Sequence, residues 1–160
     1  MLKKSKKLIF YLILALSLLG LVACSDVLDQ PQKLEDQQVE EDILNEDEAY
    51  YELEEVVSYL EKFKKLPKNY LTKKEAKKLG WQAQEGNLWQ VTDKMLIGGD
   101  IFHNREKKLP LKEGRKYYEA DINYQGGRRN AERIIYSNDG LIYYSKDHYK
   151  SFELLRGQDD

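Results

Sequence analysis

The stretch ERIIYSNDGLIYYS, from Glu132 to Ser145, decides the fold class of this chain. Two short segments in it, 132–137 and 141–145, are rich in β-branched and aromatic residues, and the turn-forming sequence SNDG at 137–140 joins them. Segments of this composition favour strands, and a short Asn-, Asp- and Gly-containing connection favours a hairpin. The sequence therefore predicts a pair of antiparallel strands at this point.

Three more segments of the same kind surround the hairpin: MLIGGDIF at 95–102, KYYEADINY at 116–124 and SFELL at 151–155. Clusters of Gly, Asn, Asp and Lys separate them, and no internal repeat is visible. The C-terminal half of the chain is therefore predicted to form an antiparallel sheet.

Helices are predicted before these strands. In residues 49–65 the apolar positions recur at helical spacing, acids come first and lysines last, and Pro67 follows. A capping-box pattern, TKKE at 72–75, starts a second short helix that Gly80 ends. Helices followed by strands predict an α+β fold, with N-terminal helices packed on one face of a C-terminal antiparallel β-sheet.

The N-terminal residues are predicted to be a signal peptide, 1–23. Four lysines precede a 15-residue apolar run at 8–22, which is short for a membrane span of about 20 residues. The sequence LVAC at 21–24 resembles a bacterial lipobox, which implies acylation of Cys24 and cleavage before it. A signal-anchor helix, and a cysteine that merely lies near a cleavage point, are the alternatives. Cys24 is the only cysteine, so no disulfide can form within one molecule.

Charge divides the rest of the chain. Residues 26–55 carry 13 Asp and Glu against one lysine, whereas residues 56–160 have a net charge of +6. We assign 24–50 to an acidic linker, disordered from Asp26 to about Asn45, and 51–160 to the folded domain. As a flexible coil the linker would hold the domain roughly 25–30 Å from its anchor. A transient electrostatic cover for a basic site is the other interpretation of its charge.

Candidate catalytic groups gather in EADINYQGGRRNAER at 119–133. Glu119 and Asp121 should face the same side of a strand, roughly 7 Å apart. If the two strands pair, the guanidinium groups of Arg129 and Arg133 are expected to converge on Glu119; ordinary surface ion pairs are the alternative. Guanidinium groups suit phosphate oxygens, and a neighbouring carboxylate can accept a proton from an attacking hydroxyl.

The chain offers two histidines as the general acid that this base requires, His103 and His148. Neither belongs to a metal-binding motif, and no Walker loop or DNA-reading motif is present, so we expect no metal and no cofactor. A base, an acid and arginines without a metal point to attack by the substrate's own 2′-hydroxyl, hence to RNA rather than DNA.

From about Tyr51 to Arg156 the chain closely resembles the barnase-like extracellular guanyl-preferring bacterial ribonucleases. The motifs that carry this resemblance are KLPKNYLTKKEAKKLGW at 65–81, IGGDIF at 97–102, NRE at 104–106, EADINY at 119–124, RNAERIIYS at 129–137 and DHY at 147–149. The resemblance implies the α+β fold of microbial ribonucleases. It also implies cleavage 3′ of guanine through a 2′,3′-cyclic phosphate, which is then hydrolysed.

The resemblance also assigns roles to residues. Glu119 would be the general base and His148 the general acid, while Lys73, Arg129 and Arg133 would stabilise the charge of the transition state. The six residues implied to bind the base are Phe102, His103, Asn104, Arg105, Glu106 and Tyr149. Within this set Glu106 would accept from guanine N1–H and the exocyclic amine, backbone N–H groups near Asn104 would bind O6, and the aromatic rings would stack.

Two positions depart from the family pattern. His103 stands where relatives usually carry a small residue, and Lys107 replaces a glycine just past the pocket. A larger side chain at position 103 can point to solvent; altered base preference is the alternative. Asp121 is expected to hold the arginines in place, and Arg115 and Asp139 are expected to form a structural pair.

Two other functions remain open on the sequence alone. One is a non-catalytic, surface-tethered module that binds RNA or protein, and the other is a glycosidase that uses Glu119 and Asp121. An active ribonuclease also implies a partner, a small acidic inhibitor that resembles barstar. We expect a monomer on the outer face of the cytoplasmic membrane, attached through Cys24, or released to the extracellular space.

Overall fold

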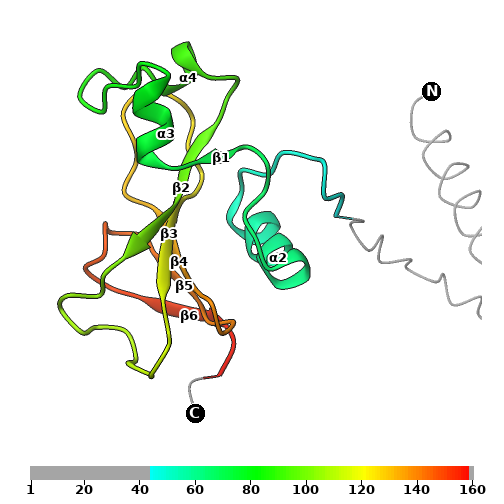
Figure 1. Ribbon diagram of the computed structural model, residues 1–160, viewed down its shortest axis with the longest axis vertical. Coiled ribbons are helices and arrows are strands. Elements are labelled where there is room, and N and C mark those ends of the chain that lie inside the picture. Colours follow the sequence, from blue (N-terminus) through cyan, green and yellow to red (C-terminus); the bar gives the residue numbers. More distant parts are fainter. Residues whose placement is uncertain (1–43, 159–160) are drawn as a thin grey trace, which may run out of the picture. The chain divides into compact units, whose positions relative to one another are not determined.

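The computed structural model describes residues 44–158, and these build one six-stranded sheet with three helices (Figure 1). The predicted signal peptide, Cys24 and most of the predicted linker lie outside the described residues. Among residues 44–158 no helix has the length and apolar character that a membrane crossing requires.

The sheet runs in sequence order, β1-β2-β3-β4-β5-β6. Its strands are β1 (Tyr70–Leu71), β2 (Leu96–Phe102), β3 (Tyr117–Asp121), β4 (Arg133–Ser137), β5 (Ile142–Ser145) and β6 (Glu153–Arg156). The β1 and β2 strands pair in parallel, and every other neighbouring pair is antiparallel. The predicted α+β fold and the hairpin at 132–145 are confirmed, whereas the short parallel strand β1 was not predicted.

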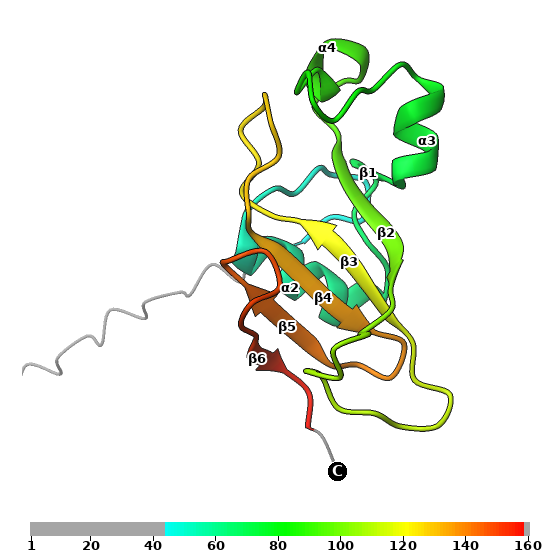
Figure 2. The same ribbon diagram turned by 90° about the vertical axis from the view of Figure 1, so that its left-hand side faces the viewer.

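The helix α2 (Leu53–Phe63) covers one face of the sheet (Figure 2). Its buried residues form one hydrophobic core with Ile134 of β4, Ile142 of β5 and Ile122, which directly follows β3. A capping box between Glu52 and Glu55 starts the helix, and the left-handed residue Lys64 ends it. The helical periodicity in the sequence was therefore interpreted correctly.

The helices α3 (Lys73–Lys78) and α4 (Leu88–Val91) lie near the end of the sheet where β2 begins (Figures 1 and 2). Thr72 caps α3 through the predicted capping box with Glu75. A second core surrounds these elements and contains Ala76, Trp81, Leu88, Leu96 and Tyr124. This packing fixes the N-terminus of α3 against β2, and so fixes the position of Lys73.

The folded domain begins before the predicted boundary at residue 51. Tyr50 is buried, and its backbone exchanges two hydrogen bonds with the side chain of Asn69. Its hydroxyl accepts from the backbone N–H of Asn45, and the hydroxyl of Tyr59 donates to the Glu46 carbonyl. Residues 44–50 thus belong to the domain rather than to a disordered linker, because one buried aromatic anchors an otherwise acidic segment.

Candidate functional site

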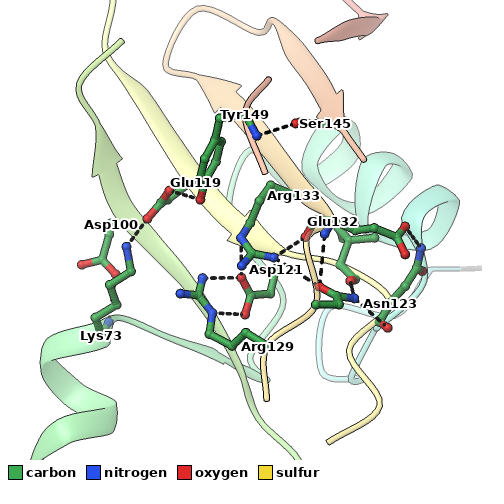
Figure 3. Close-up of polar contacts among 12 residues, drawn as sticks. Lys73, Asp100, Glu119, Asp121, Asn123, Arg129, Glu132, Arg133, Ser145 and Tyr149 are labelled. Carbon is green, nitrogen blue, oxygen red and sulfur yellow. Dashed lines mark hydrogen bonds and ion pairs between the residues drawn. The ribbon is translucent and has the colours of Figure 1, made fainter. Parts of the chain in front are cut away.

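The two carboxylates of β3 lie on the same side of the sheet, as alternate positions of a strand should (Figure 3). Glu119 is 7% exposed and Asp121 is fully buried. Carboxylates at this depth require partners, because an unpaired buried charge is strongly destabilising. Each carboxylate has a separate set of partners.

Glu119 is bound through both of its oxygens. The ammonium of Lys73, at the start of α3, contacts Oε1, and the hydroxyl of Tyr149 donates to Oε2. The backbone N–H of Lys73 donates to Asp100 Oδ2 on β2 at 2.9 Å, which orients the first turn of the helix. The structure therefore brings Lys73 to Glu119 across 46 residues of sequence.

These contacts set the charge of Glu119. Burial alone would raise the pKa of this carboxyl, but hydrogen bonds from Lys73 and Tyr149 and the charges of Lys73 and Arg129 outweigh burial and lower the pKa below its ordinary value of 4.5. The pKa of the Tyr149 hydroxyl is raised by burial and by its bond to the carboxylate. At neutral pH Glu119 is thus ionised and Tyr149 is the proton donor between them.

The two predicted arginines converge on Asp121 and not on Glu119. Arg129 binds both oxygens of Asp121, with Nε at 2.6 Å from Oδ2, and Arg133 Nε lies 3.1 Å from Oδ1. The register explains this correction, since Arg133 is the cross-strand partner of Asp121 whereas Glu119 lies opposite Ile135. Asp121 therefore holds the two guanidinium groups, as predicted for it.

Arg133 is almost completely buried and is held from several sides. Its Nη1 donates to the Glu132 carbonyl at 2.7 Å and to Asn130 Oδ1 at 3.2 Å. Its Nε contact with Asp121 is an ion pair without the alignment of a hydrogen bond. The guanidinium plane is thus fixed by the protein before any ligand is present.

His148 lies in a tight loop between β5 and β6. His148 and Tyr149 both have positive φ, 57° and 68°, which is strained for residues with a Cβ. The carboxylate of Asp147 stabilises this loop: hydrogen bonds from the Ser151 hydroxyl and backbone N–H are the main causes that lower its pKa to about 2. The His148 N–H donates to the Ala131 carbonyl at 3.0 Å, which ties the loop to the arginine segment.

The loop places His148 beside the arginines that bind Asp121 and beside Tyr149, which binds Glu119. It lines a cavity of about 540 Å³ together with Arg128, Arg129 and Arg133. The ring of His148 lies 4.7 Å from that of Tyr149, measured between centroids, and Tyr149 in turn contacts Glu119. His148 and the guanidinium groups thus line one cavity, which can bind a phosphate, and Tyr149 connects His148 with the carboxylate of Glu119.

A second cavity, of about 300 Å³, adjoins this cluster through Tyr149. It is lined by all six residues that were predicted to bind the base, namely Phe102, His103, Asn104, Arg105, Glu106 and Tyr149, and also by Ile101, Lys108 and Phe152. Sequence reasoning missed the last three residues. Lys108 lies two residues after Glu106, and two opposite charges this close in one loop were a signal that could have indicated Lys108.

The loop that lines this cavity has two left-handed residues, Asn104 at φ 43° and Lys107 at φ 52°, and only Asn104 is among the lining residues. The buried amide of Asn104 donates to the Leu109 carbonyl at 2.8 Å and accepts from its N–H at 3.1 Å. His103 is exposed and also lines the cavity. The rings of Phe102 and Tyr149, 5.3 Å apart, form the apolar side.

The predicted pair of Arg115 and Asp139 is present. Arg115 Nε donates to Asp139 Oδ2 at 2.8 Å, and the arginine side chain is 2% exposed. The Ser137 hydroxyl and this arginine lower the pKa of Asp139 against the effect of its partial burial. The pair lies at the hairpin turn and away from the catalytic candidates.

Comparison with known proteins identifies the family of the chain. The ribonuclease family profile matches residues 54–156. A ribonuclease from Heyndrickxia coagulans is 52% identical over 101 residues, which cover 63% of this chain and 93% of that protein. A ribonuclease from Bacillus intermedius is equally similar over 62% of its length. The guanyl-specific ribonuclease St of Saccharopolyspora erythraea is 37% identical over 57 residues, 35% of this chain and 56% of that protein. With the match extending from α2 to the last strand, the chain belongs to the ribonuclease family.

Proposed function

We propose that this chain is an endoribonuclease that cleaves single-stranded RNA on the 3′ side of guanine without a metal ion. The observation that carries the proposal is the position of Glu119. Lys73 and Tyr149 hold it ionised, and Tyr149 links it to His148, which shares a cavity with the arginines. Acid–base chemistry on a phosphodiester requires these groups together, whereas binding alone does not.

In the first step Glu119 accepts the proton of the 2′-hydroxyl, and the 2′-oxygen attacks the phosphorus. The bond from phosphorus to the 5′-oxygen breaks, and His148 gives its proton to that oxygen. The product is a 2′,3′-cyclic phosphate. In hydrolysis a water attacks the phosphorus while His148 accepts its proton, and Glu119 returns a proton to the departing 2′-oxygen.

Lys73, Arg129 and Arg133 stabilise the additional negative charge of the five-coordinate phosphorus. Arg133 needs no reorganisation for this, because Asp121, Asn130 and the Glu132 carbonyl already hold its guanidinium. Lys73 is bound to Glu119 in the free protein and reorients toward a phosphate oxygen when substrate enters. Asp121 is occupied by two guanidinium groups, which makes it unsuitable as the second carboxylate of a glycosidase.

Guanine binds in the cavity of about 300 Å³. Glu106 accepts from N1–H and the exocyclic amine, a donor pair that adenine lacks. Phe102 and Tyr149 provide stacking surface, which contributes about 1–3 kcal/mol per base in comparable contacts. His103 lies at the exposed rim of this cavity, so a large side chain is accommodated there.

The purified protein, given a GpN dinucleotide in EDTA, should release guanosine 2′,3′-cyclic phosphate. Glu119→Ala and His148→Ala should each lower turnover by about 10²–10⁴-fold, the usual contribution of a general base or acid. Lys112→Ala, which removes an exposed charge outside this cluster, is the control. RNA binding without product would instead support the non-catalytic module, and loss of activity in EDTA would overturn the metal-independent mechanism.

The N-terminal features support a second part of the proposal: export by a signal peptide, a lipid on Cys24 and attachment to the outer face of the membrane. A monomer with a small acidic inhibitor as its partner completes it, since the cations beside Glu119 offer a surface to carboxylates. Labelling with a radioactive fatty acid should depend on Cys24, and a Cys24→Ala variant that is still labelled would contradict this. A leaderless protein that is harmless in cells without any inhibitor would count against the partner.

A further inference from the structure

Lys108 contacts two different parts of the proposed site. Its ammonium lies 2.7 Å from Glu106 Oε2, in the loop that lines the base cavity. The same ammonium donates to the carbonyls of Tyr149 at 3.2 Å and Lys150 at 3.3 Å, more than 40 residues away in sequence. One side chain therefore connects the carboxylate that would read guanine with the backbone just after His148.

The second of these segments is one whose backbone requires support. His148 and Tyr149 have positive φ, and the carbonyls bound by Lys108 are those of Tyr149 and the next residue. Tyr149 also donates its hydroxyl to Glu119. A shift of this segment would displace the imidazole and the tyrosine together, and with them the hydrogen bond that orients the general base.

We propose that Lys108 is a positioning residue that couples recognition of guanine to the placement of the loop carrying His148. The ammonium of Lys108 is shared by one carboxylate and two carbonyls, so holding the carboxylate in place restricts the position of the ammonium at the two carbonyls. When guanine holds Glu106 in the cavity, Lys108 is held as well and keeps the Tyr149 and Lys150 carbonyls in place. A base that does not engage Glu106 leaves this connection mobile.

This inference rests on the proposed function and extends it: the guanine preference is expressed in turnover, and not in binding alone. An exposed ion pair by itself contributes little, and Lys108 and Glu106 are 39% and 75% exposed. Simple attraction of Lys108 to the RNA backbone would act equally on all substrates. The dependence of kcat on the identity of the nucleobase therefore distinguishes coupling through Lys108 from simple attraction of Lys108 to the RNA backbone.

The test compares kcat and KM for a GpA and an ApA dinucleotide in three variants. Lys108→Met removes the ammonium but keeps the length of the side chain, and should lower kcat about fivefold for GpA and much less for ApA. Lys108→Arg, which retains donors, should restore most of the difference. Lys107→Met is the matched control, because it removes the same charge one residue earlier. The positive φ at position 107 strains a lysine and a methionine equally.

A double-mutant cycle adds a second measurement. In Glu106→Gln, which weakens the acceptor, adding Lys108→Met should change the GpA to ApA ratio of kcat by less than twofold, as expected for two residues that act as one unit. Equal losses for both dinucleotides in Lys108→Met, or a change confined to KM, would overturn the coupling. If wild-type protein shows no guanine preference at all, the proposed function fails instead, so the two failures can be told apart.

Discussion

Asp121 offers the sharpest test of how the arginine cluster is built. Replacing it by asparagine keeps the shape of the side chain but removes its charge and turns one acceptor oxygen into a donor NH₂ group. Asp121 is fully buried, binds Arg129 through two oxygens and lies 3.1 Å from Arg133. The Asp121→Asn protein would therefore hold two guanidinium groups with no carboxylate between them.

The expected magnitude follows from burial. Removing one partner of a buried ion pair costs about 3–5 kcal/mol, because the remaining charge is left without compensation. The Arg133 side chain is 2% exposed and is poorly solvated, whereas that of Arg129 is 19% exposed and can be solvated in part. We expect a loss of about 3 kcal/mol in the free energy of unfolding, and a fall in Tm of roughly 12 °C for a domain of this size.

Urea unfolding and thermal scans of Asp121→Asn measure this loss directly, and cleavage of GpN reports the accompanying effect on the arginines. Asp139→Asn is the matched control, because it makes the same substitution at an ion pair whose carboxylate is 33% exposed. It should cost less than Asp121→Asn, because Asp139 is partly exposed and contacts one guanidinium group instead of two. An Asp121→Asn protein no less stable than Asp139→Asn would refute the view that Asp121 is the anchor of the cluster.

Four further variants test the loops and the proposed general base. Lys107→Gly, at φ 52°, should raise the free energy of unfolding by about 0.5 kcal/mol in urea titrations, since glycine adopts this conformation without strain. The lowered pKa of Glu119 should place the acid limb of kcat/KM below pH 4.5, and Tyr149→Phe should move that limb to higher pH. The contribution of ionised Glu119 to the free energy of unfolding is likewise present above pH 4.5 and is lost as pH falls through the lowered pKa. Gly86→Ala, whose Cβ would lie 2.5 Å from the Gly127 carbonyl carbon, should destabilise the protein by more than about 2 kcal/mol in thermal scans, whereas Gly114→Ala, with nothing within 4 Å, should cost about 1 kcal/mol.

Patterns that lie within one segment of sequence were sufficient to predict most elements. Helical spacing located α2, the capping box located α3, and the turn-forming residues located the hairpin of β4 and β5. The two-residue strand β1 escaped prediction because its identity depends on parallel pairing with β2, which no local pattern records. The start of the domain escaped for the same reason, since Tyr50 is anchored by Asn69 from a later segment.

In the candidate site, too, local patterns could be predicted from the sequence, whereas contacts between distant segments could not. The resemblance supplied the candidate residues, and the alternation of β3 placed Glu119 and Asp121 on one side. Which carboxylate the arginines bind depended on the register of β3 and β4, and the sequence left that register open. The bond of Tyr149 to Glu119 was also missed, because Tyr149 was interpreted only as a stacking surface.

The partners of Glu119 raise a chemical question that the geometry itself answers. A carboxylate whose pKa is lowered by Lys73, Tyr149 and Arg129 is ionised at neutral pH, yet it is also a weaker base. In the proposed mechanism a phosphate that enters between the cations competes for Lys73, and each hydrogen bond that leaves Glu119 raises its proton affinity. In that mechanism Glu119 therefore becomes a stronger base when substrate is bound, whereas in the free protein the same contacts keep this buried carboxylate ionised.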